Sequence, residues 1–130
     1  MEGMFRFATD FDQDLSGFDT SRVTKMHGMF ANSPYNRGLA TWDVSSVTDM
    51  AFMFYKNPNF NQNLASWDVS SVTTMESMFE EATSFNGDVS TWQTNSLTAM
   101  SKMFLDAHAF DQDLSGWDVS SGKQAVSGEY

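Results

Sequence analysis

The residues best suited to chemistry are aspartates that recur at regular intervals. One column of polar side chains directly follows an aromatic residue: Asp19, Asp43, Asp68 and Asp118, with Gln93 in the fourth place. If these segments are neighbouring strands, successive carboxylates lie about 4.8 Å apart and repel one another by roughly 1 to 3 kcal/mol. Such a column needs compensation, either from local hydrogen bonds to backbone amides and hydroxyls or from a cation shared between repeats. Because Gln93 interrupts a continuous metal ladder, we expect local bonds such as one between Asp68 and Ser70.

A second acidic run has the spacing that opens a calcium loop. It comprises Asp10, Asp12 and Asp14, with an echo at Asp111 and Asp113. Alternate carboxylates can converge on one hard cation, but no glycine or closing glutamate follows at the positions that an EF-hand loop requires. The central copies carry asparagine in the same places. We therefore expect these side chains to cap the loop backbone from turn to turn, with a calcium site as the alternative.

The sequence offers no constellation for catalysis. His27 and His108 fall in different repeats, no nucleophile stands beside either, and the chain has no cysteine. The ten methionines and the tryptophans fall in phase with other apolar positions, which favours core packing over metal or sugar binding. We expect no enzymatic activity and no cofactor.

These residues are positioned by a repeat of 25 residues, with one step of 24. The landmarks of the repeat are a leucine column, a tryptophan column, a Met-Phe pair and a further aromatic: Leu15, Leu39, Leu64, Val89 and Leu114; Phe18, Trp42, Trp67, Trp92 and Trp117; Phe5, Phe30, Phe54, Phe79 and Phe104; Phe11, Tyr35, Phe60, Phe85 and Phe110. A fixed period in this range is typical of a solenoid, in which each unit buries its apolar face against its neighbours.

Each repeat predicts one strand and one helix. The pattern Leu-x-x-Trp-x-Val at residues 64–69 predicts a short strand, and the apolar stripe at residues 72–82 predicts a short helix with Thr73 as its N-cap and Glu76 completing a capping box. The expected fold is an α/β solenoid, leucine-rich-repeat-like, of about five repeats with one short parallel strand plus one short helix each. It covers residues 1–121, and a polar tail follows at 122–130. Because both terminal repeats are incomplete, we expect a fragment of a longer array.

Composition limits the partners. A net charge of −10, with seven basic residues and no basic cluster, argues against nucleic acid and against an anionic membrane surface. No apolar run is long enough to span a bilayer, so we expect no membrane insertion. The absence of cysteine excludes disulfides and thiolate metal sites.

The repeat consensus FNQDLSxWDVSSVTxMxxMFxxA resembles the BspA-like leucine-rich-repeat surface proteins, in the 25-residue type found in mycoplasma lipoproteins. The resemblance extends from Met1 to about Ser121 and departs from the pattern at Phe18 and Thr20 and over residues 93–95. It implies a secreted or cell-surface protein that serves adhesion or recognition and has no catalytic activity.

We therefore predict a module that recognises a protein or glycan ligand through its open strand face. The polar positions of that face are Asp19, Asp43, Asp68, Gln93, Asp118, Thr41, Ser66, Thr91, Ser45, Ser70 and Asn95. The alternative is an architectural spacer or assembly subunit that docks through its open repeat ends onto other copies of the array.

Overall fold

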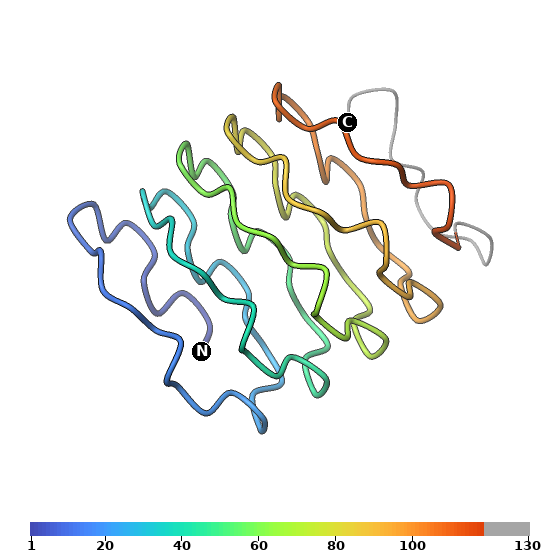
Figure 1. Cartoon of the computed structure of the whole chain (residues 1–130), viewed down its shortest axis with the longest axis horizontal. Helices are drawn as coiled ribbons and strands as arrows, with labels where there is room; N and C mark the ends of the chain where they lie inside the picture. The colour runs from blue at the N-terminus through green and yellow to red at the C-terminus, as the bar shows by residue number, and fades with distance from the viewer. Residues whose placement is uncertain (119–130) are drawn as a thin grey trace.

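The computed structural model describes residues 1–118, which wind into a row of coils lying side by side (Figure 1). Each coil is one repeat, so that residues 24 or 25 positions apart in sequence are neighbours in space. No helix and no extended strand forms within residues 1–118. The pairing between coils that resembles a sheet is limited to isolated parallel bridges: Lys25 with Asp49, Asp49 with Thr74, and Thr74 with Ala99. The predicted α/β solenoid of strand-plus-helix, leucine-rich-repeat-like units is therefore wrong.

The segment predicted as a helix, residues 72–82, is a run of tight turns. Ser77 and Glu81 adopt left-handed φ angles of 53° and 56°, which no α-helix contains. The N–H of Met78 bonds to the carbonyl three residues back, whereas the N–H of Ser77 bonds to Ser101 in the next coil. Alternate N–H groups along the segment thus divide between local turns and the neighbouring coil.

Every coil repeats two left-handed positions, four residues apart, and we call the stretch around them the tight-turn segment. These positions are Gly3 and Phe7, Gly28 and Asn32, Phe52 and Lys56, Ser77 and Glu81, and Lys102 and Asp106. A residue other than glycine costs about 1 to 2 kcal/mol in this conformation. The bonds to the next coil and the burial of the apolar columns offset that cost.

The predicted helix cap and the predicted strand also differ from the structure. Thr73 does not cap a helix, because its hydroxyl donates to the carbonyl of Thr48 in the preceding coil at 3.1 Å. Residues 64–69 form a turn in which the N–H of Trp67 bonds to the carbonyl of Leu64. The predicted alternation of burial is nevertheless confirmed: Trp67 and Val69 are buried, and Asp68 between them is exposed.

The core consists of side-chain columns that run through the stack. Phe79 stacks between Phe54 and Phe104, with ring centroids 5.4 and 5.6 Å apart, and Trp67 stacks on Trp92 at 6.3 Å. Most methionines lie in the same core, as predicted: Met26, Met29, Met50, Met53, Met75, Met78, Met100 and Met103. Each indole N–H donates to a carbonyl of the leucine column in the preceding coil, as Trp67 does to Leu39 at 2.9 Å. The tryptophans therefore tie successive coils together.

The described residues include the predicted repeat region up to Asp118. The last positions of that region, 119–121, and the predicted polar tail at 122–130 lie outside them. Within residues 1–118, no helix is long and apolar enough to cross a membrane.

Candidate recognition surface

The aspartates that follow the tryptophan column are fixed by the serine two residues on. The Oδ1 atom of Asp43 accepts the N–H of Ser45 at 2.9 Å and its hydroxyl at 2.6 Å. Asp19 with Ser21 and Asp68 with Ser70 repeat the arrangement. The expectation of local bonding is confirmed. We call this row of three Asp-Ser turns, at residues 19–21, 43–45 and 68–70, the Asp-Ser row.

The serine bonds favour the charged form of these carboxylates. The hydroxyl of Ser45, and then its backbone N–H, lower the pKa of Asp43, and the neighbouring charge of Asp19 acts in the opposite direction. Asp19 and Asp68 have a lowered pKa for the same reason. All three side chains are exposed and ionised at neutral pH. Among residues 1–118, no donor bonds to the Oδ2 atom of any of the three.

The hydroxyls predicted to face a partner mostly join the coils. Thr41, Ser66 and Thr91 donate to carbonyls of the preceding coil at 3.1, 2.8 and 2.9 Å. Ser45 and Ser70 donate to their own aspartates. These hydroxyl donors are used within the protein, so in the three Asp-Ser turns the groups left for a partner are the carboxylate acceptors.

The fourth coil has no Asp-Ser turn at the predicted surface, because Gln93 and Asn95 replace the aspartate and the serine. Gln93 and Asn95 are exposed, and Thr94 between them is buried. The Thr94 hydroxyl accepts the N–H of Asp118 at 2.9 Å and lies 3.3 Å from its carbonyl. Thr20 likewise donates to the Asp43 carbonyl at 2.9 Å. The two threonines that depart from the valine of the consensus are thus buried links between coils, a role that the sequence pattern did not indicate.

The predicted calcium run does not converge. Asp12 pairs with the Arg37 guanidinium at 2.9 Å, and Asp14 accepts the N–H of Ser16 at 2.9 Å. In the echo, Asp113 accepts the N–H of Ser115, and Asp111 and Asp10 are exposed. In the described part of the chain, no group of three or more His, Asp or Glu side chains could hold a metal ion.

Asparagines cap the adjoining loop from one coil to the next, as expected. The N–H of Asn61 bonds to Oδ1 of Asn36 at 2.9 Å, that of Asn86 to Oδ1 of Asn61 at 2.8 Å, and that of Asp111 to Oδ1 of Asn86 at 2.8 Å. Gln62 adds a second bond, because its amide donates to the same Oδ1 atom of Asn36. This side-chain ladder fixes the register of the coils without a β-sheet.

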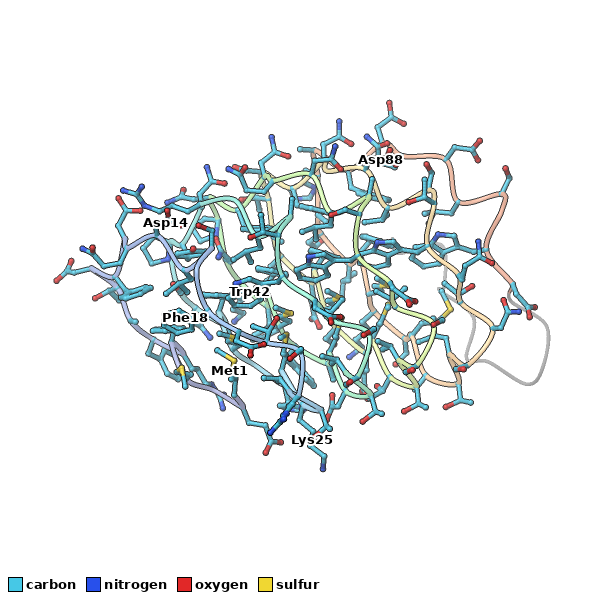
Figure 2. The ribbon with its side chains drawn as sticks, turned by 60° about the horizontal axis from the view of Figure 1, so that its bottom comes forward. Met1, Asp14, Phe18, Lys25, Trp42 and Asp88 are labelled. Atoms are coloured by element: carbon cyan, nitrogen blue, oxygen red, sulfur yellow. The ribbon has the colours of Figure 1, made fainter. Side chains whose placement is uncertain are left out.

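Asp14 and Asp88 belong to a second set of Asp-Ser turns, just before the leucine column. Their pKa values are lowered by bonds from Ser16 and Ser90 respectively. Figure 2 shows Asp14 and Asp88 along one edge of the stack and Lys25 at the opposite edge, with Trp42 between them. This second set offers a comparison for the Asp-Ser row, since it has the same local chemistry at another place in the repeat.

The histidines are not helix residues, because no helix exists here. His108 is exposed, whereas His27 lies with Nδ1 3.2 Å from Oδ2 of Asp49 in the next coil. The sequence reasoning missed this pair. The repeat period would have identified it, because Asp49 lies beside Lys25 of the preceding coil, two residues before His27.

A family model described as "Mycoplasma protein of unknown function, DUF285" matches residues 1–37 and 31–127. The chain belongs to this family. Neither a curated protein nor a solved structure matches it. Membership of DUF285 agrees with the mycoplasma part of the resemblance seen in the sequence. The identity as a BspA-like leucine-rich-repeat protein is not confirmed.

Proposed function

We propose that this DUF285 chain is a non-catalytic recognition module whose Asp-Ser row binds a basic segment of a protein partner. The proposal rests on one observation: Asp19, Asp43 and Asp68 each carry a carboxylate that is held by two serine bonds on Oδ1. Since the serines fix the side chains beforehand, a partner that bonds to Oδ2 need not order them. Arginine and lysine form the strongest hydrogen bonds to such oxygens.

The charge of the whole chain supports a cationic partner. A net charge of −10 attracts basic segments at long range and accelerates their association, an effect that salt weakens. A glycan ligand, the other class expected from the sequence, would use the same acceptors without this attraction. Adhesion at the cell surface or after secretion is part of the proposal and is taken from the resemblance to surface proteins.

The test uses hexalysine as the probe and amide NMR shifts as the readout. Replacing Asp43 and Asp68 by Asn keeps an Oδ1 acceptor for the serine but removes the charge. We expect hexalysine to move the amides of Ser45 and Ser70, and the double variant to bind it several-fold more weakly. The matched control is Asp88→Asn, which removes one charge from an Asp-Ser turn outside the row.

Two results would contradict the proposal. Equal weakening by Asp88→Asn and by either single variant of the row would mean that only the total charge matters. Unchanged binding by the double variant, with its circular dichroism spectrum intact, would exclude the row as the site.

A second candidate function is architectural, as part of an assembly of repeats. The three large apolar side chains that are most exposed, Met4, Phe7 and Phe18 at 53%, 61% and 47%, all lie in the first coil. The carbonyls of His27 and Met29 in the second coil accept N–H groups of the first coil. Met4 is the equivalent of Met29 in the first coil, and among the described residues no backbone N–H bonds to its carbonyl. This edge therefore suits a further coil of the same kind, whichever chain supplies it.

Light scattering on a sizing column tests this second candidate. Self-association that Met4→Gln with Phe18→Gln abolishes would support an assembly role. A monomeric mass for the unsubstituted chain at high concentration would contradict self-assembly, and it would leave the Asp-Ser row as the better-supported surface.

A further inference from the structure

A hollow of about 320 Å³ opens over the tight-turn segments of the first three coils. It is lined by Arg6, His27, Gly28, Ala31, Phe52 and Tyr55. None of these residues belongs to the Asp-Ser row. The hollow therefore requires an explanation of its own.

The hollow exists because the column of first left-handed positions, which is without a side chain at Gly3 and Gly28, lacks one at Gly28 beside the Phe52 ring. Gly28 occupies a left-handed position at φ +63°, and a Cβ added there would meet nothing within 4 Å. The equivalent residues Phe52, Ser77 and Lys102 adopt the same conformation, at 59°, 53° and 58°. Since this backbone tolerates other residues, the fold does not require a glycine at position 28. The glycine leaves room beside the ring of Phe52.

Three rings form a fixed aromatic wall. Phe52 is only half-buried and therefore contributes little to the core. Its left-handed backbone is strained, and this burial does little to offset the strain. The Phe52 ring lies 5.5 Å from that of His27 and meets that of Tyr55 edge to face at 5.4 Å. Asp49 orients the imidazole of His27 by its contact with Nδ1. A strained residue that presents a half-exposed ring to a hollow is a candidate for a binding role.

A cation without a carboxylate partner stands at the rim. The Arg6 guanidinium lies 5.1 Å from the centre of the Phe7 ring. Within residues 1–118, Arg37 pairs with Asp12 and Lys56 with Glu81, whereas no carboxylate lies within ion-pair distance of four other basic side chains: Arg6, Arg22, Lys25 and Lys102. Of these four, Arg6 is the one that lines the hollow. In a chain with a net charge of −10, an arginine left unpaired beside an aromatic hollow is available to an anionic ligand.

The geometry points to a binding site for a sugar ring that carries a carboxylate, such as a hexuronic acid unit of an acidic glycan. The apolar face of the ring stacks on Phe52, the carboxylate pairs with Arg6, and His27 hydrogen-bonds to a ring hydroxyl. The volume lies at the lower end of the range of roughly 300 to 1,000 Å³ typical of small-molecule sites. An apolar ligand would leave Arg6 unpaired, and a neutral sugar would do the same. This site is independent of the function proposed for the Asp-Ser row.

The test is a titration of the full chain with sodium glucuronate, followed by amide NMR, with glucose and acetate as comparisons. We expect glucuronate to move the amides of Gly28, Phe52 and Tyr55, and glucose and acetate each to bind about tenfold more weakly. Arg6→Ala and Phe52→Ser should each weaken glucuronate binding by about tenfold. Both substitutions insert a residue that the fold already carries at the equivalent place of another coil, Ala31 and Ser77.

The controls separate a lost site from a lost fold. Gly28→Phe inserts the residue that the next coil carries at the equivalent position 52, meets nothing within 4 Å at its Cβ, and should block binding by occupying the hollow, while Lys102→Ser changes the same column three coils away and should not. Acetate that binds as tightly as glucuronate would reduce the site to an anion contact and overturn the proposal. Equal affinity for glucose, or shifts at the Asp-Ser row in place of Gly28, would also overturn it.

Discussion

The hydrogen bonds of the tryptophan column give a sharp test of how the coils are held together. Trp67 is 3% exposed, stacks on Trp92, and donates its indole N–H to the Leu39 carbonyl at 2.9 Å. Replacing Trp67 by Phe deletes two buried carbons and the indole nitrogen. The carbons contribute about 0.8 kcal/mol each and the lost hydrogen bond about 1 kcal/mol. The Leu39 carbonyl keeps its bond from the N–H of Trp42, so no full desolvation penalty follows.

Trp67→Phe should therefore lower the free energy of unfolding by about 2.5 kcal/mol. Urea denaturation followed by circular dichroism measures this change, provided that the slope of the transition is unchanged. The matched control is Phe18→Leu, which alters the same column where it is 47% exposed and should cost less than about 0.5 kcal/mol. Equal effects of the two substitutions would refute the argument that the buried tryptophans tie the coils together.

Four further predictions follow from single features. Gly87→Ala should destabilise strongly, by about 3 kcal/mol or more, because an added Cβ would lie 2.2 Å from the Gln62 carbonyl oxygen; an unchanged melting temperature would contradict this. Tyr35→Phe should not destabilise and should stabilise by up to about 1 kcal/mol, since the buried Tyr35 hydroxyl has no partner of good hydrogen-bond geometry among the described residues and makes only a weak contact with the Leu15 carbonyl, which already accepts the Trp42 indole N–H; a loss of stability in urea would reveal a strong bond to this hydroxyl. Ser45→Ala should raise the pKa of Asp43, measured by carbon NMR of the carboxyl group. A carboxyl group whose pKa is lowered by folding stabilises the folded state at pH values above its ordinary pKa of about 3.9, and this stabilisation is lost as the pH falls through the folded pKa. The variant lacks part of it, so its acid unfolding should begin at a higher pH than that of the unsubstituted chain; coincident acid transitions would contradict this. Calcium should leave the melting temperature and the mass in solution unchanged, since no cluster of ligands is present among residues 1–118; a higher melting temperature in calcium would show that the acidic loops rearrange.

The repeat, its register and its buried columns were predictable from the sequence, because the positions of Phe79, Trp67 and their equivalents recur with one period. The secondary structure was not predictable in the same way. Turns closed by hydrogen bonds between residues three apart place apolar side chains at nearly the same spacing as a helix does. The apolar stripe from Met75 to Ala82 therefore fits a run of turns as well as a helix. The left-handed positions decide between them. In two coils the sequence indicates the first of these positions by a glycine, Gly3 or Gly28. In the other three coils the same position is Phe52, Ser77 or Lys102, and these residue types do not indicate a left-handed conformation.

In the candidate site, too, some contacts were predictable from the sequence and others were not. The bond between Asp68 and Ser70 was predictable because it is local, and the asparagine ladder because the repeat places Asn36 beside Asn61. The use of Thr41 and its equivalents to join the coils was not, since a hydroxyl on an exposed face is equally suited to a ligand. The hollow beside Gly28 depends on one missing side chain and on rings from separate coils, which no local pattern describes.

The division of alternate N–H groups between two kinds of partner has a consequence for hydrogen exchange. In the tight-turn segment the amide of Ser77 is protected by the next coil, and the amide of Met78 by a turn within its own coil. Separation of two coils exposes only the first kind, and unfolding of a coil exposes both. Neighbouring amides in one segment therefore report separately on the two events. Exchange rates along a single coil would show whether the stack opens coil from coil or melts as one unit.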